Sequence, residues 1–171
     1  MTLAHALPQA TSSGPRTLLK RALTTVATST IAAAALLGGA HPAAAADSTA
    51  ELRTAVVKLT NVARANKGCG PLTANAQLTT AAQRHAKDMA AKGYFSHTSA
   101  DGTSWDARIR SAGFKKPGGE NIAQGFKTPA RVLQAWLESP GHRRNILDCA
   151  FTSIGVGFTT DGGYWVQDFG Y

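Results

Sequence analysis

Three polar residues in the second half of this 171-residue chain carry side chains suited to ligand binding or proton transfer. They are His97 in YFSHTSADG, Glu120 in GGENI and His142 in SPGHRRNIL, and each stands beside turn-forming residues and an apolar anchor. Two imidazoles and a carboxylate can coordinate a divalent cation such as zinc, leaving a position for water. They can equally form a hydrogen-bonded acid–base cluster. The gaps of 23 and 22 residues match no local metal motif, so spacing alone favours a structural role.

Other patterns typical of enzymes are weak. The chain has no G-x-S-x-G elbow, and Ser96 is only a sequence neighbour of His97, which does not make a catalytic triad. The segment KKPGGEN has the glycines of a phosphate loop but neither its spacing nor a following helix. Glu120 and Glu138 are candidates for the paired carboxylates of a glycosidase, but nothing in the sequence places them face to face.

The first 46 residues are typical of an export signal. Three basic residues precede an apolar, alanine-rich run from Ala22 to Gly39, and no acidic residue occurs before Asp47. The segment AAAAD supplies the small residues that a signal peptidase recognises. We therefore expect cleavage after Ala46, secretion by the general route, and no membrane span in the mature chain.

The mature chain, residues 47–171, has a length suited to one domain with one core. It keeps 15 basic and 10 acidic residues, a net charge of +5, and these charges are scattered. This balance is compatible with anionic envelope polymers or lipid head groups as partners, although an ordinary soluble surface explains it equally well. Without a basic stripe and interleaved aromatic residues, nucleic-acid binding is not expected. We expect a monomer.

Both cysteines, Cys69 and Cys149, fall in the mature part. In an exported protein one cysteine pair most simply forms one disulfide, here closing a loop of about 80 residues. Two free thiols or half of a metal site are the alternatives. We interpret the pair as structural.

Apolar periodicity, caps and glycines predict four helices. The first opens at Ser48 with capping-box spacing to Glu51 and ends before Gly68. The second covers about residues 75–92, and His85 lies on its apolar side, which predicts a packed, hydrogen-bonded core histidine. The third follows residues 103–104 and ends at residue 113, and the fourth begins with a Thr-Pro cap at residues 128–129.

After the fourth helix the pattern changes from helix to strand. SIGVGFTT and YWVQDFGY flank DGG, which predicts a strand–turn–strand hairpin. ENIAQG is a candidate for a further short strand, whereas the Pro-Gly pair before His142 predicts a turn. Helices first and a hairpin last indicate an α+β domain in which helices cover a small antiparallel sheet.

Taken in order, several segments resemble a bacterial CAP domain. They are NVARANKGCGPLTANAQLTTAAQRHAKDMA, YFSHTSADG, GGENIA, AWLESPGHRRNIL, IGVGF and YWVQDFG. Each fragment is weak alone, but the ordered set is specific and covers nearly the whole mature chain. It is most similar to single-domain secreted members from actinobacteria, which share the cysteine positions in GCGPL and NILDC. The animal members' extra cysteine-rich module is missing from this sequence.

The resemblance implies a three-layer α-β-α sandwich and a groove lined by two histidines and two acidic residues. By motif these are His97, His142 and Glu120, which the family fold brings together. The second acid of plant and animal relatives falls at Ser139 here, and Glu138 stands one place early. One residue on a helix turns a side chain by about 100°, so we expect Glu138 to face solvent. Ser139 is then a candidate groove residue or a cap for the turn.

The function implied is a secreted, non-enzymatic binding domain. Its His97, Glu120 and His142 groove is predicted to hold a divalent cation such as zinc and to bind a lipid, glycan or other envelope ligand. A hydrolase acting on peptide or cell-wall material, with the cluster or a metal-bound water as base, is the alternative. A third possibility is that the cluster only links loops together.

Overall fold

A long helix, α1 (Pro42–Lys67), leads into the domain in the computed structural model, which describes residues 42–171 and their side chains from Ser48 onward. The predicted export segment, apart from its last residues, lies outside the described residues. The helix begins six residues earlier than predicted, so Ser48 lies inside it and is no cap. Alanines at four of the added positions explain the difference, since alanine is the best helix former.

Two helices follow with the predicted boundaries. Helix α2 (Ala76–Lys92) is capped by Asn75, whose side chain accepts hydrogen bonds from the backbone N–H groups of residues 77 and 78. It ends at Gly93, whose left-handed φ of 66° suits glycine. Helix α3 (Trp105–Ser111) is short and is joined to α2 by the 93–104 loop.

The prediction of a turn at His142 is wrong. Helix α4 (Pro129–Glu138) starts as expected, with the Thr128 side chain accepting from a first-turn N–H group. Ser139 then adopts an extended conformation and a new helix, α5 (Pro140–Ile146), begins at once. Proline is well suited to the first position of a helix, because its missing N–H and fixed φ cost nothing there. The Pro-Gly pair therefore ends α4 and starts α5, and it places His142 on a helix.

The sheet has four strands in the order β1-β3-β4-β2. Strands β3 (Ser153–Thr159) and β4 (Tyr164–Gly170) form the predicted hairpin, and β2 (Pro117–Ala123), predicted as ENIAQG, pairs antiparallel with β4. The sheet is mixed rather than purely antiparallel, because β1 (Thr73–Ala74) pairs in parallel with β3. Two residues are too few for a strand pattern to be visible in the sequence.

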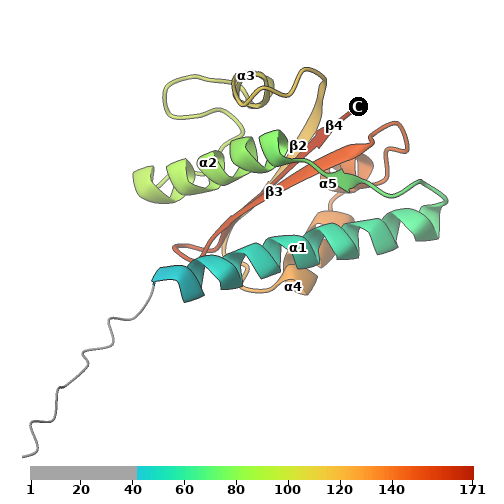
Figure 1. The fold of residues 1–171 in the computed structure, drawn as a ribbon, viewed down its shortest axis with the longest axis horizontal. Helices are drawn as coiled ribbons and strands as arrows, with labels where there is room; N and C mark the ends of the chain where they lie inside the picture. The colour runs from blue at the N-terminus through green and yellow to red at the C-terminus, as the bar shows by residue number, and fades with distance from the viewer. Residues whose placement is uncertain (1–41) are drawn as a thin grey trace, which may run out of the picture. The chain divides into compact units, whose positions relative to one another are not determined.

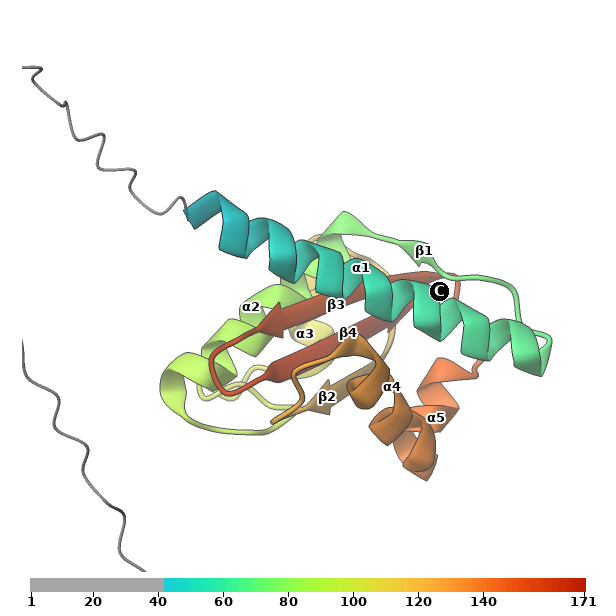
Figure 2. The ribbon, with the colours of Figure 1, turned by 90° about the horizontal axis from the view of Figure 1, so that it is seen from below.

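The helices cover both faces of this sheet (Figures 1 and 2). Helices α2 and α3 lie on one face, and α1, α4 and α5 lie on the other. Two fully buried tryptophans, Trp136 of α4 and Trp165 of β4, belong to the core on the second face. The predicted three-layer α-β-α sandwich is confirmed.

Two glycines of β3 set how closely α2 approaches the sheet. A Cβ atom on Gly155 would lie 2.1 Å from the backbone of Leu78, and one on Gly157 would lie 2.3 Å from the backbone of Ala82. Such contacts are far shorter than van der Waals separation, and helix backbone cannot give way as a flexible side chain can. The motif IGVGF is therefore explained by helix–sheet packing.

The predicted disulfide between Cys69 and Cys149 is present. Beside it, the fully buried guanidinium of Arg64 donates to the carbonyl oxygens of Gly70, Ile146, Asp148 and Phe151 at 2.7–3.0 Å. Together they tie the end of α1 to the segment between α5 and β3. None of the helices within residues 42–171 has the length and apolar character needed to cross a membrane.

Replacing both cysteines by alanine should lower the free energy of unfolding by about 4–5 kcal/mol, because the reduced chain regains the entropy of a loop spanning 80 residues. Urea unfolding of the double variant and of wild type measures the difference. Wild type unfolded in the presence of a reductant is the matched control and should give the same loss. A loss below about 1 kcal/mol would show that the bridge contributes little.

Candidate functional site

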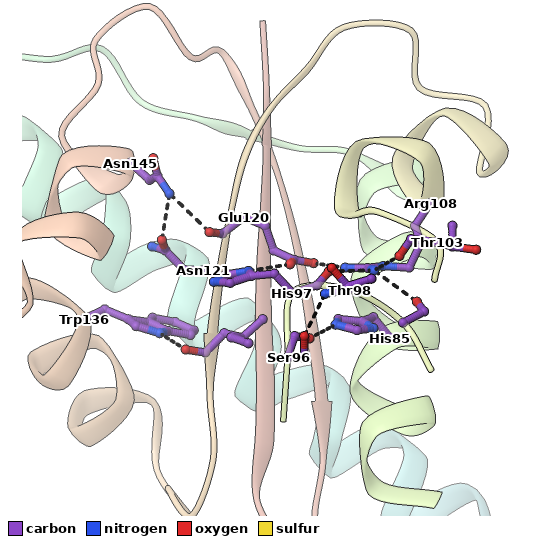
Figure 3. Close-up of polar contacts among 12 residues, drawn as sticks. His85, Ser96, His97, Thr98, Thr103, Arg108, Glu120, Asn121, Trp136 and Asn145 are labelled. Carbon is purple, nitrogen blue, oxygen red and sulfur yellow. Dashed lines mark hydrogen bonds and ion pairs between the residues drawn. The ribbon is translucent and has the colours of Figure 1, made fainter. Parts of the chain in front are cut away.

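Glu120 of β2 lies at the centre of the candidate site, with its side chain only 1% exposed (Figure 3). One carboxylate oxygen lies 2.8 Å from Nδ1 of His97, and the other accepts from Nη2 of Arg108 at 2.6 Å. The imidazole, 48% exposed, therefore has its Nδ1 side directed at a buried carboxylate and its Nε2 side free of that contact. A carboxylate in this position fixes both the orientation and the tautomer of a histidine ring.

Arg108 of α3 shapes the loop that carries His97 (Figure 3). Its Nη1 donates to the carbonyl oxygens of His97 and Thr103 and to the Ser99 hydroxyl at 2.9–3.1 Å. One guanidinium thus joins the 93–104 loop to Glu120. Arg108 was not predicted from the sequence. Its surroundings, WDARIR, are typical of a short helix whose arginines face solvent.

Asp168 of β4 is a second acidic group behind Glu120. The two residues are directly paired in the β2–β4 register, and Asp168 is fully buried. Burial, followed by the negative charge of Glu120, raises the pKa of Asp168 well above its usual range. Its Oδ1 atom has no hydrogen-bond partner among residues 42–171. The sequence signal was a polar pair, Gln167 and Asp168, inside an otherwise apolar strand.

His142 is held in place through its backbone. The Asn121 side chain of β2 donates to the His142 carbonyl oxygen at 3.1 Å. Asn145, one turn further along α5, donates to the Asn121 side chain at 2.9 Å and to the Glu120 carbonyl at 3.2 Å (Figure 3). These amides fasten α5 to β2. Partial burial, followed by the nearby charge of His97, lowers the pKa of His142, which favours its neutral imidazole.

Ser139 and His142 line the same cleft, together with apolar and aromatic residues of β2 and α4. The Ser139 side chain makes no capping hydrogen bond to α5, although its carbonyl oxygen accepts from the Arg143 N–H. Glu138 is exposed and accepts from Gln134 on its own helix, so the prediction that it faces solvent is confirmed.

His85 is the core histidine that the sequence predicted. It is 1% exposed on α2, and its Nε2 atom lies 2.9 Å from the Ser96 carbonyl oxygen (Figure 3). Desolvation lowers its pKa, so the ring is neutral and Nε2–H is the donor. This bond anchors the chain next to His97.

Metal binding by His97, Glu120 and His142 stays a prediction. Within the part of the chain that the structure describes, no three His, Cys, Asp or Glu side chains are grouped so as to hold an ion. Both oxygens of Glu120 already have partners, whereas Nε2 of His97 and the His142 ring have none in the hydrogen bonds of the described residues. The donor set thus fits two imidazole ligands better than a Glu120 ligand.

An α-β-α sandwich with an imidazole and carboxylate groove on its edge strand defines the class of this domain. Residues 57–169 match the family model of the cysteine-rich secretory protein family, CAP, and the chain therefore belongs to that family. YkwD of Bacillus subtilis (strain 168) is 44% identical over 115 residues, which are 67% of this chain and 45% of YkwD. The membrane protein YlbC of the same organism is 33% identical over 115 residues, 67% of this chain and 33% of YlbC. This chain spans less than half the length of either relative.

Solved structures show the same fold. An extracellular protein with an SCP domain from Bacillus anthracis superposes with a TM-score of 0.72 and 30% identity, covering 78% of this chain and 44% of that one. An outer surface protein from Borrelia burgdorferi has a TM-score of 0.65 and 25% identity, covering 71% of this chain and 93% of that one. Both neighbours are extracellular or surface proteins.

Changing Arg108 to methionine should destabilise the domain by about 3–5 kcal/mol, because the Glu120 carboxylate then stays buried without its cation. Chemical unfolding measures the loss. Arg110→Met is the matched control: this arginine lies on the same helix, and its ion pair with Asp106 is exposed and 3.8 Å long, so little change is expected. Equal losses in the two variants would contradict a special role for Arg108.

Asp168→Asn should change how stability depends on pH. Between the ordinary aspartate pKa near ~3.9 and the raised pKa of the folded state, Asp168 is ionised only when the chain is unfolded. Wild type therefore loses stability as pH rises through this window, by up to about 1.4 kcal/mol per pH unit, whereas asparagine does not titrate. The free energy of unfolding, measured from pH 4 to pH 7, should rise in the variant relative to wild type as the pH increases. Parallel profiles would refute the raised pKa.

Proposed function

We propose that this chain is a secreted binding module without catalytic activity, and that the groove containing His97 and His142 holds its ligand. The observation that carries the proposal is the Glu120 contact to Nδ1 of His97, which leaves Nε2 of a half-exposed ring available to an incoming group. His142 supplies a second imidazole from α5, and the Asn121 side chain of β2 holds its backbone carbonyl at 3.1 Å. Ser139 lines the cleft beside His142 and is a further contact candidate.

The two imidazoles also suit a divalent cation such as zinc. In this proposal His97 and His142 are the ligands, and Glu120 is the carboxylate that orients His97 rather than a direct ligand. Bound zinc would supply a Lewis-acid centre that can accept an oxygen of a ligand. The lowered pKa of His142 favours the neutral ring that coordination requires.

The contacts of Glu120 argue against Glu120 itself as a general base. A general base needs a carboxylate oxygen free to take a proton from water. Here Arg108 occupies one oxygen and His97 the other, and the side chain is 1% exposed. Turnover of peptidoglycan or of a peptide library, abolished by Glu120→Gln, would favour the hydrolase instead.

Export is the second part of the proposal. The charge pattern and alanine-rich run of residues 1–46 support it, as does the disulfide, which oxidising compartments favour. Two structural neighbours are an extracellular protein and an outer surface protein, which is consistent with export. The ligand would then be a lipid, a glycan or another component of the envelope.

Zinc should raise the melting temperature of the protein, because an ion that binds only the folded state stabilises it. The gain is about 2.7 kcal/mol at a zinc concentration 100 times the Kd. His97→Ala/His142→Ala should lose this gain, and the gain should fade as pH falls through the histidine range near ~6.5. Differential scanning fluorimetry with and without zinc measures both effects.

The matched control is Glu138→Ala, which removes an exposed polar side chain of α4 that faces solvent and should keep the full zinc effect. Equal zinc effects in wild type and in the His97/His142 variant would overturn the metal assignment.

A further inference from the structure

Two clefts follow one another along β2. The first, about 380 Å³, lies at the start of the strand and is lined by His97, Trp105, Gly118, Gly119, Glu120 and Asn145. The second, about 420 Å³, lies at its end and includes Phe95, Ile122, Phe126, Trp136, Ser139 and His142 in its lining. Residues 118–120 border the first cleft and residues 122–124 border the second, and the stretch 118–124 is roughly 20 Å long at ~3.3 Å per residue. One imidazole lines each cleft, and a ligand that fills both clefts must be elongated.

The free edge of β2 is closed to an added peptide strand. β2 is an edge strand, and such edges pair readily with extended peptides. Here the indole of Trp136 donates to the Ile122 carbonyl oxygen at 3.0 Å, and Asn145 donates to the Glu120 carbonyl oxygen at 3.2 Å (Figure 3). These side chains occupy the acceptors that strand addition would use. An elongated ligand in this groove must therefore bind through side chains.

Aromatic rings stand at both ends of the groove. Trp105 borders the first cleft and is partly exposed. Phe95 borders the second cleft and is 49% exposed, so its ring is accessible to a ligand. The same two linings include hydrogen-bonding groups, namely the two imidazoles and Ser139. A sugar chain matches this order, because each ring has an apolar face that packs on an aromatic ring and hydroxyls that bond at its edge.

The charge of the lining selects among sugar chains. Of the described residues that line the two clefts, none is lysine or arginine. Glu120 is the acidic member, and Arg108 neutralises it. The two linings thus offer an anionic polymer no lysine or arginine to pair with. A neutral chain needs no such pairing.

We infer that the groove binds a neutral, extended, β-linked glycan, with sugar rings packed on Trp105 and Phe95 and the polar groups of intervening sugars on His97 and His142. This inference rests on the proposed function, since it assigns a ligand class to the same groove. A glycan strand of the cell envelope is the source to which it points.

The test is titration of the purified full-length chain with a hexamer of β-1,4-linked N-acetylglucosamine, a soluble neutral glycan. Intrinsic fluorescence reports directly on the site, because two of the three tryptophans, Trp136 and Trp165, are buried and Trp105 is partly exposed. We expect saturable binding with a change in fluorescence. Calorimetry gives the affinity of variants that lack the reporter.

Trp105→Ala and Phe95→Ala should each weaken binding by about tenfold. Tyr171→Ala is the matched control, since this aromatic ring is 52% exposed, close to the value for Phe95, but does not border either cleft. It should bind as wild type does. Equal binding by all variants would overturn the placement in this groove.

Comparison ligands separate the remaining outcomes. Tighter binding of an anionic hexagalacturonate, of a fatty acid or of an extended decapeptide than of the neutral hexamer would overturn the glycan inference and leave a binding groove. Absence of hexamer binding while zinc still raises the melting temperature would overturn only this inference. Cleavage of the hexamer would support the glycan and overturn the non-catalytic proposal.

Discussion

The carboxylate of Glu120 is the constraint on which the site depends. A side chain that is 1% exposed cannot keep a negative charge without a partner, and Arg108 supplies one at 2.6 Å. The same guanidinium collects acceptors from the 93–104 loop, so neutralising the charge also folds the loop that presents His97. Asp168 behind Glu120 has a raised pKa, because burial and the charge of Glu120 favour its neutral form. The Arg108–Glu120 pair therefore fixes the shape of the loop and the orientation of the His97 ring, and it also neutralises the buried charge.

The other half of the groove is organised by neutral amides. Asn121 and Asn145 fasten α5 to β2, and Gln167 extends the network by accepting from Asn121 and donating to Thr60 of α1. Buried amides of this kind must all be satisfied, which makes the arrangement specific. Asn145 and the indole of Trp136 also occupy the Glu120 and Ile122 carbonyl oxygens on the free edge of β2. The protein therefore presents a groove made of side chains, where an open strand edge would invite peptide pairing or aggregation.

These two halves give the groove its chemical character. His97 is oriented by a carboxylate, and the lowered pKa of His142 favours a neutral ring. Arg108 neutralises Glu120, and the two cleft linings contain no Lys or Arg, so the groove is polar but close to neutral, although the chain as a whole is basic. That combination suits a ligand recognised by hydrogen bonds and ring packing, and it separates the groove from the charged outer surface.

The sequence by itself determined the helices with clear caps, the β3–β4 hairpin, the disulfide pair and the core role of His85, because local periodicity, turn residues and composition encode these features. The ordered motifs also predicted His97, Glu120 and His142 as one site, of which the structure joins His97 to Glu120, and they predicted that Glu138 faces solvent. Only the tertiary structure decided that Pro140 begins a helix, that β1 joins the sheet, and that Arg108 and Asp168 surround Glu120. Those outcomes depend on which distant segments become neighbours. A buried charge pair between such segments produces no periodic pattern in the sequence from which it could be predicted.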